Sequence, residues 1–299
     1  MIKNFIDINK FSKKQLDQII QLAKKIKKNP KKFNSVCKDL TLGMIFEKQS
    51  LRTRLSFNIG MQKLGGRVLE LNSKDIGFDN IRETPKDVLN ILAQFIDCLM
   101  IRNDNHKQVL DLGNQNVIPV INGLTEYSHP CQILGDFFTI QEYFNNYKNL
   151  QITWIGDFNN VLTSLLHLQK IYLFKLNVVV PKTIFNLNKK EIDNYKNKKL
   201  KFIFDPIKAA YNAECIMTDV WVSMGEKNKN KSKYFKDLTV NKKIIKAASK
   251  DVIFMHCLPA KRGQEVTSDV LDGKSSVILQ QAQNRMFIQQ AILIYVLQK

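Results

Sequence analysis

The chain has 299 residues, 44% of them hydrophobic, and a formal net charge of +19 at pH 7. This length is sufficient for two domains with separate cores, and no apolar run is long enough to span a membrane. The positive charge comes almost entirely from lysines in Lys/Asn-rich segments, which lack the interleaved aromatics and arginines of a nucleic-acid groove. We expect a cytoplasmic protein, because the first residues also lack the apolar core of a signal peptide.

Short apolar runs alternate with helical patterns along the chain. The run 42–46 predicts a buried strand, and the segment 54–66 predicts a helix with Leu55, Ile59 and Leu64 at helical spacing and a Gly-Gly pair to stop it. Further buried strands are predicted at 95–101, 116–121, 151–156, 176–181, 214–218 and 251–256. Further helices are predicted at 87–95, 131–144, 161–174 and about 281–297.

The polar stretch 145–151 is the predicted boundary between two domains of similar size. We expect a first domain at 1–146, a second at 147–280 and a closing helix in 281–299. Because strands alternate with helices in both halves, we predict an α/β protein in which each domain has a central parallel β-sheet flanked by helices.

Polar side chains follow the carboxyl ends of six predicted strands. They are Ser50, Arg52 and Thr53, then Arg102, His129 with Gln132, Asp157 with Asn159 and Asn160, Asp219, and the segment 257–263. Open α/β sheets bind ligands at this edge. We therefore expect an active site in a cleft between the two domains.

The first of these groups stands at a junction between a strand and a helix. The start of a helix has free backbone N–H groups and a partial positive charge. The hydroxyls of Ser50 and Thr53 and the guanidinium groups of Arg52 and Arg102 add donors there, which predicts an anion site, most naturally for phosphate. The alternative is a Ser/Thr helix cap followed by solvated arginines.

Two further groups predict binding of a carbonyl compound and of an amino acid. His129 and Gln132 lie one helical turn apart, where the imidazole can donate to a carbonyl oxygen and the amide oxygen can accept from an N–H. Asn160, Asp219 and Ser223 fit the ammonium and carboxylate groups of an amino acid. The alternatives are a helix start with a buried cysteine and a loop pinned by a core tryptophan.

The sequence predicts neither a cofactor nor a metal. The five cysteines are odd in number and never occur in CxxC spacing, which argues against a disulfide framework and a zinc site. No GxxxxGK motif is present, and the segment GDFNN (156–160) is not the GxGxxG of dinucleotide binding. The predicted ligands are a small phosphorylated carbonyl compound and an amino acid.

Eight motifs together resemble the ornithine carbamoyltransferase family from end to end. They are SLRTR (50–54), MIR (100–102), PVINGLT (119–125), HPCQ (129–132), GDFNN (156–160), TDVWVSMG (218–225), FMHCLPA (254–260) and QNR (283–285). HPCQ and the Arg/Thr loop are shared with other transcarbamylases. DVWVSMG combined with HCLP is more specific for ornithine as the acceptor.

The resemblance implies an N-terminal carbamoyl phosphate domain, a C-terminal ornithine domain, a closing helix that packs back on the first domain, and a homotrimer or a multiple of trimers. The residues that it implies for carbamoyl phosphate are Ser50, Leu51, Arg52, Thr53, Arg102, His129, Gln132, Leu258 and Arg285. Those for ornithine are Asn160, Asp219, Ser223, Met224 and Cys257, and the implied catalytic set is Arg102, His129, Asp219 and Cys257. The implied reaction is transfer of the carbamoyl group to the δ-amine of L-ornithine, giving L-citrulline and phosphate without a metal or cofactor.

Three positions depart from the family pattern. Gln49 replaces a common proline, and the other two concern the phosphate contacts. Leu51 stands where the family usually has threonine, which removes one hydroxyl from the phosphate loop. Gly77 stands about where many relatives have a glutamine that reaches toward a phosphate. We expect weaker binding of carbamoyl phosphate but an active enzyme, because the backbone N–H of Leu51 remains.

Two other functions fit parts of the sequence. A sister transcarbamylase acts on N-acylated ornithine or putrescine, but a blocked α-amine has no use for the carboxylate of Asp219. A basic nucleic-acid-binding protein would use the net charge, and it would bind DNA or RNA with a steep salt dependence and release no phosphate from carbamoyl phosphate.

Overall fold

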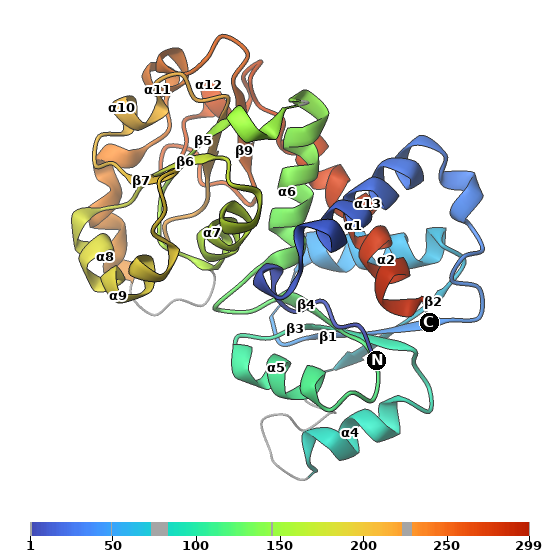
Figure 1. Ribbon diagram of the computed structural model, residues 1–299. Coiled ribbons are helices and arrows are strands. Elements are labelled where there is room, and N and C mark those ends of the chain that lie inside the picture. The colour runs from blue at the N-terminus through green and yellow to red at the C-terminus, as the bar shows by residue number, and fades with distance from the viewer. Residues whose placement is uncertain (1, 49, 73–82, 145, 223–228, 299) are drawn as a thin grey trace. The chain divides into compact units, whose positions relative to one another are not determined.

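The computed structural model describes residues 2–48, 50–72, 83–144, 146–222 and 229–298 (Figure 1). The contacts within the chain divide it into two compact units. Unit 1 comprises Met1–Phe138 and Gln283–Lys299, and unit 2 comprises Thr139–Ala282. The division falls within two helices, α6 (Pro130–Tyr143) and α13 (Ile278–Leu297). The C-terminal end of the chain therefore belongs to the same unit as its N-terminal end.

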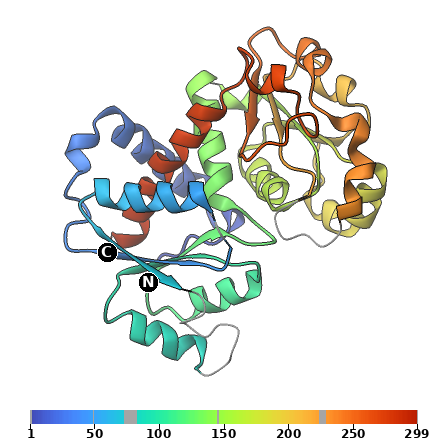
Figure 2. The ribbon, with the colours of Figure 1, turned by 180° about the vertical axis from the view of Figure 1, so that it is seen from behind.

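Unit 1 contains a four-stranded parallel sheet in the order β2-β1-β3-β4. The strands are β1 (Thr41–Phe46), β2 (Arg67–Asn72), β3 (Cys98–Arg102) and β4 (Val120–Leu124). Figures 1 and 2 show α4 (Pro85–Leu92) and α5 (His106–Asn114) on one face, and α1 (Lys13–Lys28) and α2 (Leu51–Lys63) on the other. Two short 3-10 helices are η1 (Ile8–Lys10) and η2 (Pro30–Phe33). Leu99 and Ile101 alternate along β3 and are fully buried in one core with Leu89 and Leu112.

Unit 2 contains a five-stranded parallel sheet in the order β7-β6-β5-β8-β9. The strands are β5 (Gln151–Ile155), β6 (Lys175–Val179), β7 (Leu200–Phe202), β8 (Cys215–Thr218) and β9 (Ile253–His256). The helices are η3 (Tyr147–Asn149), α7 (Asn160–Tyr172), α8 (Lys182–Leu187), α9 (Lys189–Ile192), η4 (Asp193–Tyr195), α10 (Pro206–Ala210), η5 (Lys229–Leu238), α11 (Lys242–Ala247) and α12 (Ser268–Leu271). Because crossovers between parallel strands are right-handed, this order puts α7 to α9 on one face and α10 and α11 on the other.

The predicted α/β class with two parallel sheets is confirmed, and every predicted strand has a counterpart. The sequence patterns do not predict β2 and β7, which are edge strands. All residues of β2 are exposed or half-buried, so this strand lacks the apolar run that marks a buried one. The helix predicted after β1 is also present as α2, but Leu55 and Ile59 are 52% and 39% exposed, and α2 buries Phe57 and Met61 instead.

α2 ends in a Schellman motif that uses both glycines. Gly65 has a φ of +87°, and its N–H donates to the carbonyl of Gln62 at 2.9 Å. The N–H of Gly66 donates to the carbonyl of Met61 at 3.1 Å. A Cβ atom on Gly65 would lie 2.5 Å from the carbonyl oxygen of Asn34, so both the backbone conformation and the available space require glycine.

We expect Gly65→Ala to destabilise the protein more than Gly263→Ala. Gly263 also has a positive φ, +79°, but among the described residues no heavy atom lies within 4 Å of a Cβ placed there. Gly263→Ala therefore reports the conformational cost alone, about 1–2 kcal/mol, whereas Gly65→Ala adds a clash with backbone. Urea unfolding of both variants measures the difference, and equal losses in the free energy of unfolding would contradict this reading of Gly65.

Candidate active site

The predicted phosphate residues lie where the strand order of the unit 1 sheet reverses. β1 and β3 are neighbours, and the chain continues from β1 to one edge and from β3 to the other. Ser50 follows β1 and caps α2, where its Oγ accepts a hydrogen bond from the N–H of Thr53 at 3.4 Å. Arg102 is the last residue of β3. Open α/β sheets bind ligands at such reversal points, and this one brings Ser50, Thr53 and Arg102 together.

Thr53 is fully buried, and its hydroxyl oxygen accepts hydrogen bonds from two arginines. Nη1 of Arg102 lies 3.2 Å from this oxygen and 3.1 Å from the Oγ of Ser50. Nη2 of Arg285, which comes from α13, lies 3.0 Å from the same oxygen of Thr53. Arg285 is itself only 3% exposed. The end of the chain therefore supplies a buried cation to a site built on the first sheet.

This arrangement concentrates positive charge, because two guanidinium groups lie within hydrogen-bond distance of one oxygen. Two unit charges about 6 Å apart repel by about 3 kcal/mol at an effective dielectric constant of about 20. A bound dianion offsets that repulsion and accepts charge-assisted hydrogen bonds from both groups. The geometry therefore fits phosphate better than a neutral ligand.

His129 is buried among the same cations. Burial lowers the pKa of His129 well below its ordinary value of 6.5, and the charges of Arg285, Arg102 and Arg52 lower this pKa further. The imidazole is therefore neutral at neutral pH and keeps a single N–H. Such a group suits donation of a hydrogen bond to a carbonyl oxygen.

Gln132 lies one turn beyond His129, in α6, and offers an acceptor. Its side chain is fully buried, and its Nε2 donates to Oδ1 of Asp136 at 2.7 Å. Its Oε1 is buried and has no hydrogen-bond partner among the described residues. Unpaired buried acceptors are rare in folded proteins, so this oxygen is a candidate partner for an N–H of a ligand.

The other residues of the SLRTR motif differ in their surroundings. Leu51 is the first residue of α2 and is 69% exposed, and Arg52 is half-buried. Arg54 forms an ion pair with Glu70 of β2 at 2.8 Å, and its guanidinium carbon lies 4.8 Å from the ring centre of Phe46. Arg54 therefore links α2 to the edge strand β2 and is not one of the two arginines that donate to the hydroxyl of Thr53.

The predicted amino-acid residues of unit 2 lie at the corresponding reversal point of its sheet. β5 and β8 are neighbours, and Asn159 follows β5 while Asp219 follows β8. One carboxylate oxygen of Asp219 accepts from Nδ2 of Asn159 at 2.9 Å, and the other accepts from Sγ of Cys257 at 3.0 Å. Asp219 is 6% exposed, so it is a buried carboxylate held by two neighbours and suited to an ammonium group.

Asn159 is among the polar residues predicted to follow a strand, but the sequence analysis assigns a ligand role to Asn160 and none to Asn159. Besides its contact with Asp219, Asn159 caps α7, because its Oδ1 accepts from the N–H groups of Val161 and Leu162 at 3.1 Å each. Asn160 is the first residue of α7 and is half-buried. The preference of asparagine for the position before a helix start is the signal that could have identified Asn159.

A buried histidine–glutamate pair holds the HCLP segment. Nε2 of His256 lies 3.1 Å from Oε1 of Glu265, and both side chains are fully buried. Nδ1 of His256 accepts the N–H of Leu258 at 2.8 Å, which leaves Nε2 as the ring nitrogen that donates to Glu265. Leu258 has a φ of +60°, which is unfavourable for a residue with a side chain, and this pair therefore holds a strained backbone position.

Asp219, His256 and Cys257 also form a group with metal-ligand chemistry, since one ligand atom of each lies within 4.8 Å of the others. Both ring nitrogens of His256 are already engaged, by Leu258 and Glu265, and Cys257 contacts Asp219. A cation bound here would displace these contacts. The donor set therefore fits a hydrogen-bonded network better than a metal centre.

The described site residues form two sets, one within each unit. Ser50, Leu51, Arg52, Thr53, Arg102, His129, Gln132 and Arg285 belong to unit 1, and Asn160, Asp219, Cys257 and Leu258 belong to unit 2. Ser223 and Met224, which are predicted to bind ornithine, lie outside the described residues, as does Gly77. Asp136 is an addition that comes from the structure, and Asn159 gains from it the contact with Asp219.

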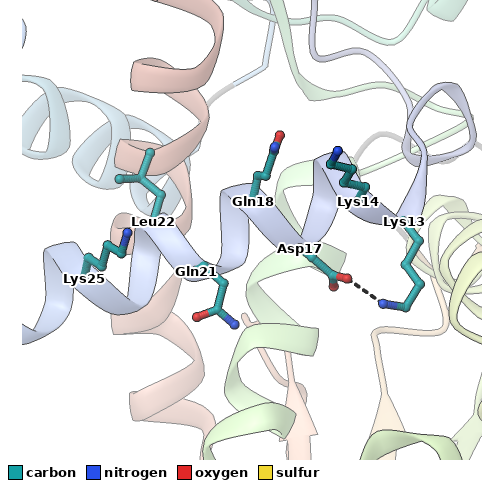
Figure 3. A pocket seen from close by; sticks show the side chains of 7 residues that line it. All are labelled: Lys13, Lys14, Asp17, Gln18, Gln21, Leu22 and Lys25. Atoms are coloured by element: carbon teal, nitrogen blue, oxygen red, sulfur yellow. Dashed lines mark hydrogen bonds and ion pairs between the residues drawn. The ribbon is translucent and has the colours of Figure 1, made fainter.

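A separate surface hollow of about 550 Å³ runs along α1 (Figure 3). It is lined by Lys13, Lys14, Asp17, Gln18, Gln21, Leu22 and Lys25. All seven residues belong to one helix, and Lys13 and Asp17 form an ion pair at 2.5 Å. None of them is a predicted site residue, and a hollow along a single helix does not have the converging groups of a ligand pocket.

Comparisons with known proteins match both halves of the chain. Residues 3–142 match the family model "Aspartate/ornithine carbamoyltransferase, carbamoyl-P binding domain", and residues 148–296 match "Aspartate/ornithine carbamoyltransferase, Asp/Orn binding domain". The ornithine carbamoyltransferase of Ruthia magnifica subsp. Calyptogena magnifica is 39% identical over 301 residues, covering 99% of this chain and 100% of that protein.

Two solved structures of proteins with that name are also similar. The ornithine carbamoyltransferase of Burkholderia thailandensis E264 has a TM-score of 0.90 at 32% identity, over 99% of both chains. That of Pyrococcus furiosus has a TM-score of 0.87 at 36% identity, over 97% of this chain and 96% of its own. The likeness therefore extends over nearly the whole chain in sequence and in structure.

The lowered pKa of His129 predicts a pH dependence of stability. Below about pH 6.5 the unfolded chain binds a proton at this imidazole that the folded protein does not bind. The free energy of unfolding is therefore expected to fall as the pH falls, by up to about 1.4 kcal/mol per pH unit from this residue. Urea unfolding of the wild type and of His129→Asn between about pH 7 and 5 measures this contribution. Parallel pH curves for the two proteins would show that His129 does not make it.

Proposed function

The chain belongs to the aspartate/ornithine carbamoyltransferase family, and we propose that it transfers the carbamoyl group of carbamoyl phosphate to the δ-amine of L-ornithine, giving L-citrulline and phosphate. The observation that carries the proposal is the buried contact of Arg102 and Arg285 with Thr53, next to a neutral His129. These residues form a site for an anion that also has a carbonyl group. Relatives named ornithine carbamoyltransferase, matched over nearly the whole chain, support ornithine as the acceptor.

The phosphate end of the proposed ligand lies at the start of α2. Ser50, Arg52, Thr53 and Arg102 hold the phosphate together with the backbone N–H of Leu51. The hydrogen bonds of Arg102 to the hydroxyls of Ser50 and Thr53 support this assignment, because they orient the guanidinium before the ligand arrives. The helix start adds the N–H donors and the partial charge that favour an anion.

We propose that protein donors contact the carbonyl oxygen of the carbamoyl group and that protein acceptors contact its nitrogen. His129, Thr53 and Arg102 donate toward the carbonyl oxygen, where negative charge develops during attack. Oε1 of Gln132 and the backbone carbonyl of Leu258 accept from the nitrogen. The unpaired Oε1 of Gln132 supports this role. Arg285 closes the pocket.

Ornithine is proposed to bind at the strand ends of unit 2. Asn160, Asp219, Ser223 and Met224 hold the amino acid, and Cys257 lies near its side-chain amine. The buried carboxylate of Asp219, fixed by Asn159 and Cys257, supports recognition of an ammonium group. An acylated α-amine has no positive charge to pair with this carboxylate, which disfavours the N-acylornithine alternative.

The reaction needs no covalent intermediate with the protein. The neutral δ-amine attacks the carbamoyl carbon, the bond from that carbon to the phosphate oxygen breaks, and the amine loses one proton as citrulline forms. An amine with a pKa of about 10.4 costs roughly 4–5 kcal/mol to deprotonate at pH 7. Positioning of two reactants supplies about 7–11 kcal/mol. Asp219 and Cys257 are the protein groups proposed to take the proton, and the departing phosphate is the third acceptor.

The proposed partners are small molecules and further copies of the chain. None of the described helices combines the length and apolar character of a membrane span. We propose a cytoplasmic homotrimer, or a multiple of trimers, from the resemblance to the family. Exposed apolar residues on α2 and on the edge strand β2, namely Leu55, Ile59 and Leu69, support a subunit contact in unit 1. A monomer in sedimentation equilibrium would contradict it.

A product assay with carbamoyl phosphate and four amines tests the function. We expect citrulline and phosphate with L-ornithine, and far less product with N-acetylornithine, putrescine or aspartate, because only ornithine offers both an α-ammonium and a free δ-amine. Preference for N-acetylornithine would overturn the choice of acceptor. Absence of phosphate release with every amine would overturn the transferase itself.

Leu51→Thr is expected to strengthen the binding of carbamoyl phosphate. A hydroxyl at the first residue of α2 can add a charge-assisted hydrogen bond, worth about 1.5–3 kcal/mol, so we expect KM for carbamoyl phosphate to fall at least ~10-fold with little change in kcat. Leu187→Thr, at a leucine that is 76% exposed on α8, is the matched control and should leave KM unchanged. An unchanged KM in Leu51→Thr would show that the missing hydroxyl at position 51 does not weaken the binding of carbamoyl phosphate.

A further inference from the structure

We propose that Asp136 is a positioning residue that makes the site distinguish carbamoyl phosphate from acyl phosphates without an amino group, such as acetyl phosphate. The inference rests on the function proposed above and adds a residue that acts through Gln132. Acetyl phosphate keeps the phosphate and the carbonyl group but has a methyl group where carbamoyl phosphate has its NH2. Hydrogen bonding can therefore distinguish the two ligands only through a contact with that nitrogen.

Asp136 determines which end of the Gln132 amide faces away from it. The two residues are four positions apart on α6, so their side chains lie on the same face, and Nε2 of Gln132 donates to Oδ1 of Asp136 at 2.7 Å. Gln132 is 0% and Asp136 is 1% exposed. Oδ1 of Asp136 is the acceptor in this contact. Inverting the amide would therefore set two acceptor oxygens against each other inside the protein.

This orientation leaves the other end of the amide for a ligand. Oε1 of Gln132 is buried, and the described part of the chain supplies no donor to it. A buried acceptor that stays unpaired destabilises the state that contains it, and the NH2 group of carbamoyl phosphate is a donor that pairs it. A methyl group leaves it unpaired. This is the condition under which a polar site rejects an analogue most strongly.

The backbone that carries Gln132 is held by contacts that do not involve Asp136. The carbonyl of His129 accepts the N–H of Gln132 at 3.1 Å, so α6 begins directly after the imidazole. Further along, α6 packs closely on α13, since a Cβ atom on Gly135 would lie 3.3 Å from Cγ of Arg285. Replacement of Asp136 is therefore expected to release the amide without moving the helix.

Dissociation constants for carbamoyl phosphate and acetyl phosphate, measured by calorimetry on the full chain without ornithine, test the proposal. For the wild type we expect carbamoyl phosphate to bind at least ~10-fold more tightly. Asp136→Asn lets the amide adopt both orientations, so the ratio of the two constants is expected to fall several-fold, mainly through weaker binding of carbamoyl phosphate. Gln132→Met keeps the side-chain length without the acceptor and is expected to lower the ratio further, leaving only the selectivity that the backbone carbonyl of Leu258 contributes.

A double variant and a matched control separate positioning from general damage. Because Asp136 acts through Gln132, Asp136→Asn combined with Gln132→Met should give the same ratio as Gln132→Met alone. Asp111→Asn makes the same charge change at a carboxylate on α5 whose side chain is 44% exposed, and it should leave the ratio unchanged. An unchanged ratio in folded Asp136→Asn, or a further loss in the double variant, would overturn the proposal.

A second variant and the wild-type ratio itself also test the proposal. If Asp136→Asn does not fold, Asp136→Ser takes its place with the same expectation, and a wild-type ratio near unity overturns the proposal without any variant. Failure of the proposed function has a different signature. A wild type that binds carbamoyl phosphate selectively but makes no citrulline would refute the proposed transfer to ornithine and leave the role of Asp136 in selectivity standing.

Discussion

The shared hydrogen bonds of Arg102 and Arg285 to the hydroxyl of Thr53 are the constraint on which the rest of the site depends. They hold two cations close together where water is largely excluded, and such an arrangement is stable only with a counter-charge or at a cost to the fold. Burial is the main cause of the lowered pKa of His129, and the same cations lower this pKa further, which leaves a neutral imidazole suited to donate to a carbonyl oxygen. The paired cations thus favour an anion and also contribute to the state of the histidine.

The two half-sites follow from one topological rule. In each sheet two neighbouring strands send the chain in opposite directions, β1 with β3 in unit 1 and β5 with β8 in unit 2. The polar residues that follow these strands meet each other directly, as Ser50 meets Arg102 and Asn159 meets Asp219. A parallel sheet that reverses its strand order leaves room at that point, so side chains there are available to ligands. The reaction proposed here needs one ligand from each half.

Much of this organisation is predictable from the sequence, and the failures have physical reasons. The buried strands have apolar runs in the sequence, and each of these strands is predicted. The edge strands β2 and β7 contain charged and exposed residues, so they have no apolar run and are not predicted. The spacing of apolar residues correctly predicts the helix α2. It does not predict which face of α2 is buried, because Leu55 and Ile59 are exposed in this chain. Motif resemblance identifies candidate ligand-binding residues. It assigns no role to Asp136, which lies outside the motifs, or to Asn159, because their contacts with Gln132 and Asp219 are recognised from distances and not from spacing along the sequence.

A calorimetric titration of the wild type and of Thr53→Val with inorganic phosphate tests most directly whether the shared contact of Arg102 and Arg285 with Thr53 forms the anion site. Removing the hydroxyl that Arg102 and Arg285 share should leave the charges in place but release their alignment. We expect phosphate to bind the wild type in competition with carbamoyl phosphate, and Thr53→Val to weaken this binding by at least ~10-fold. A wild type that does not bind phosphate, or equal affinities in the two proteins, would show that this contact does not form the anion site.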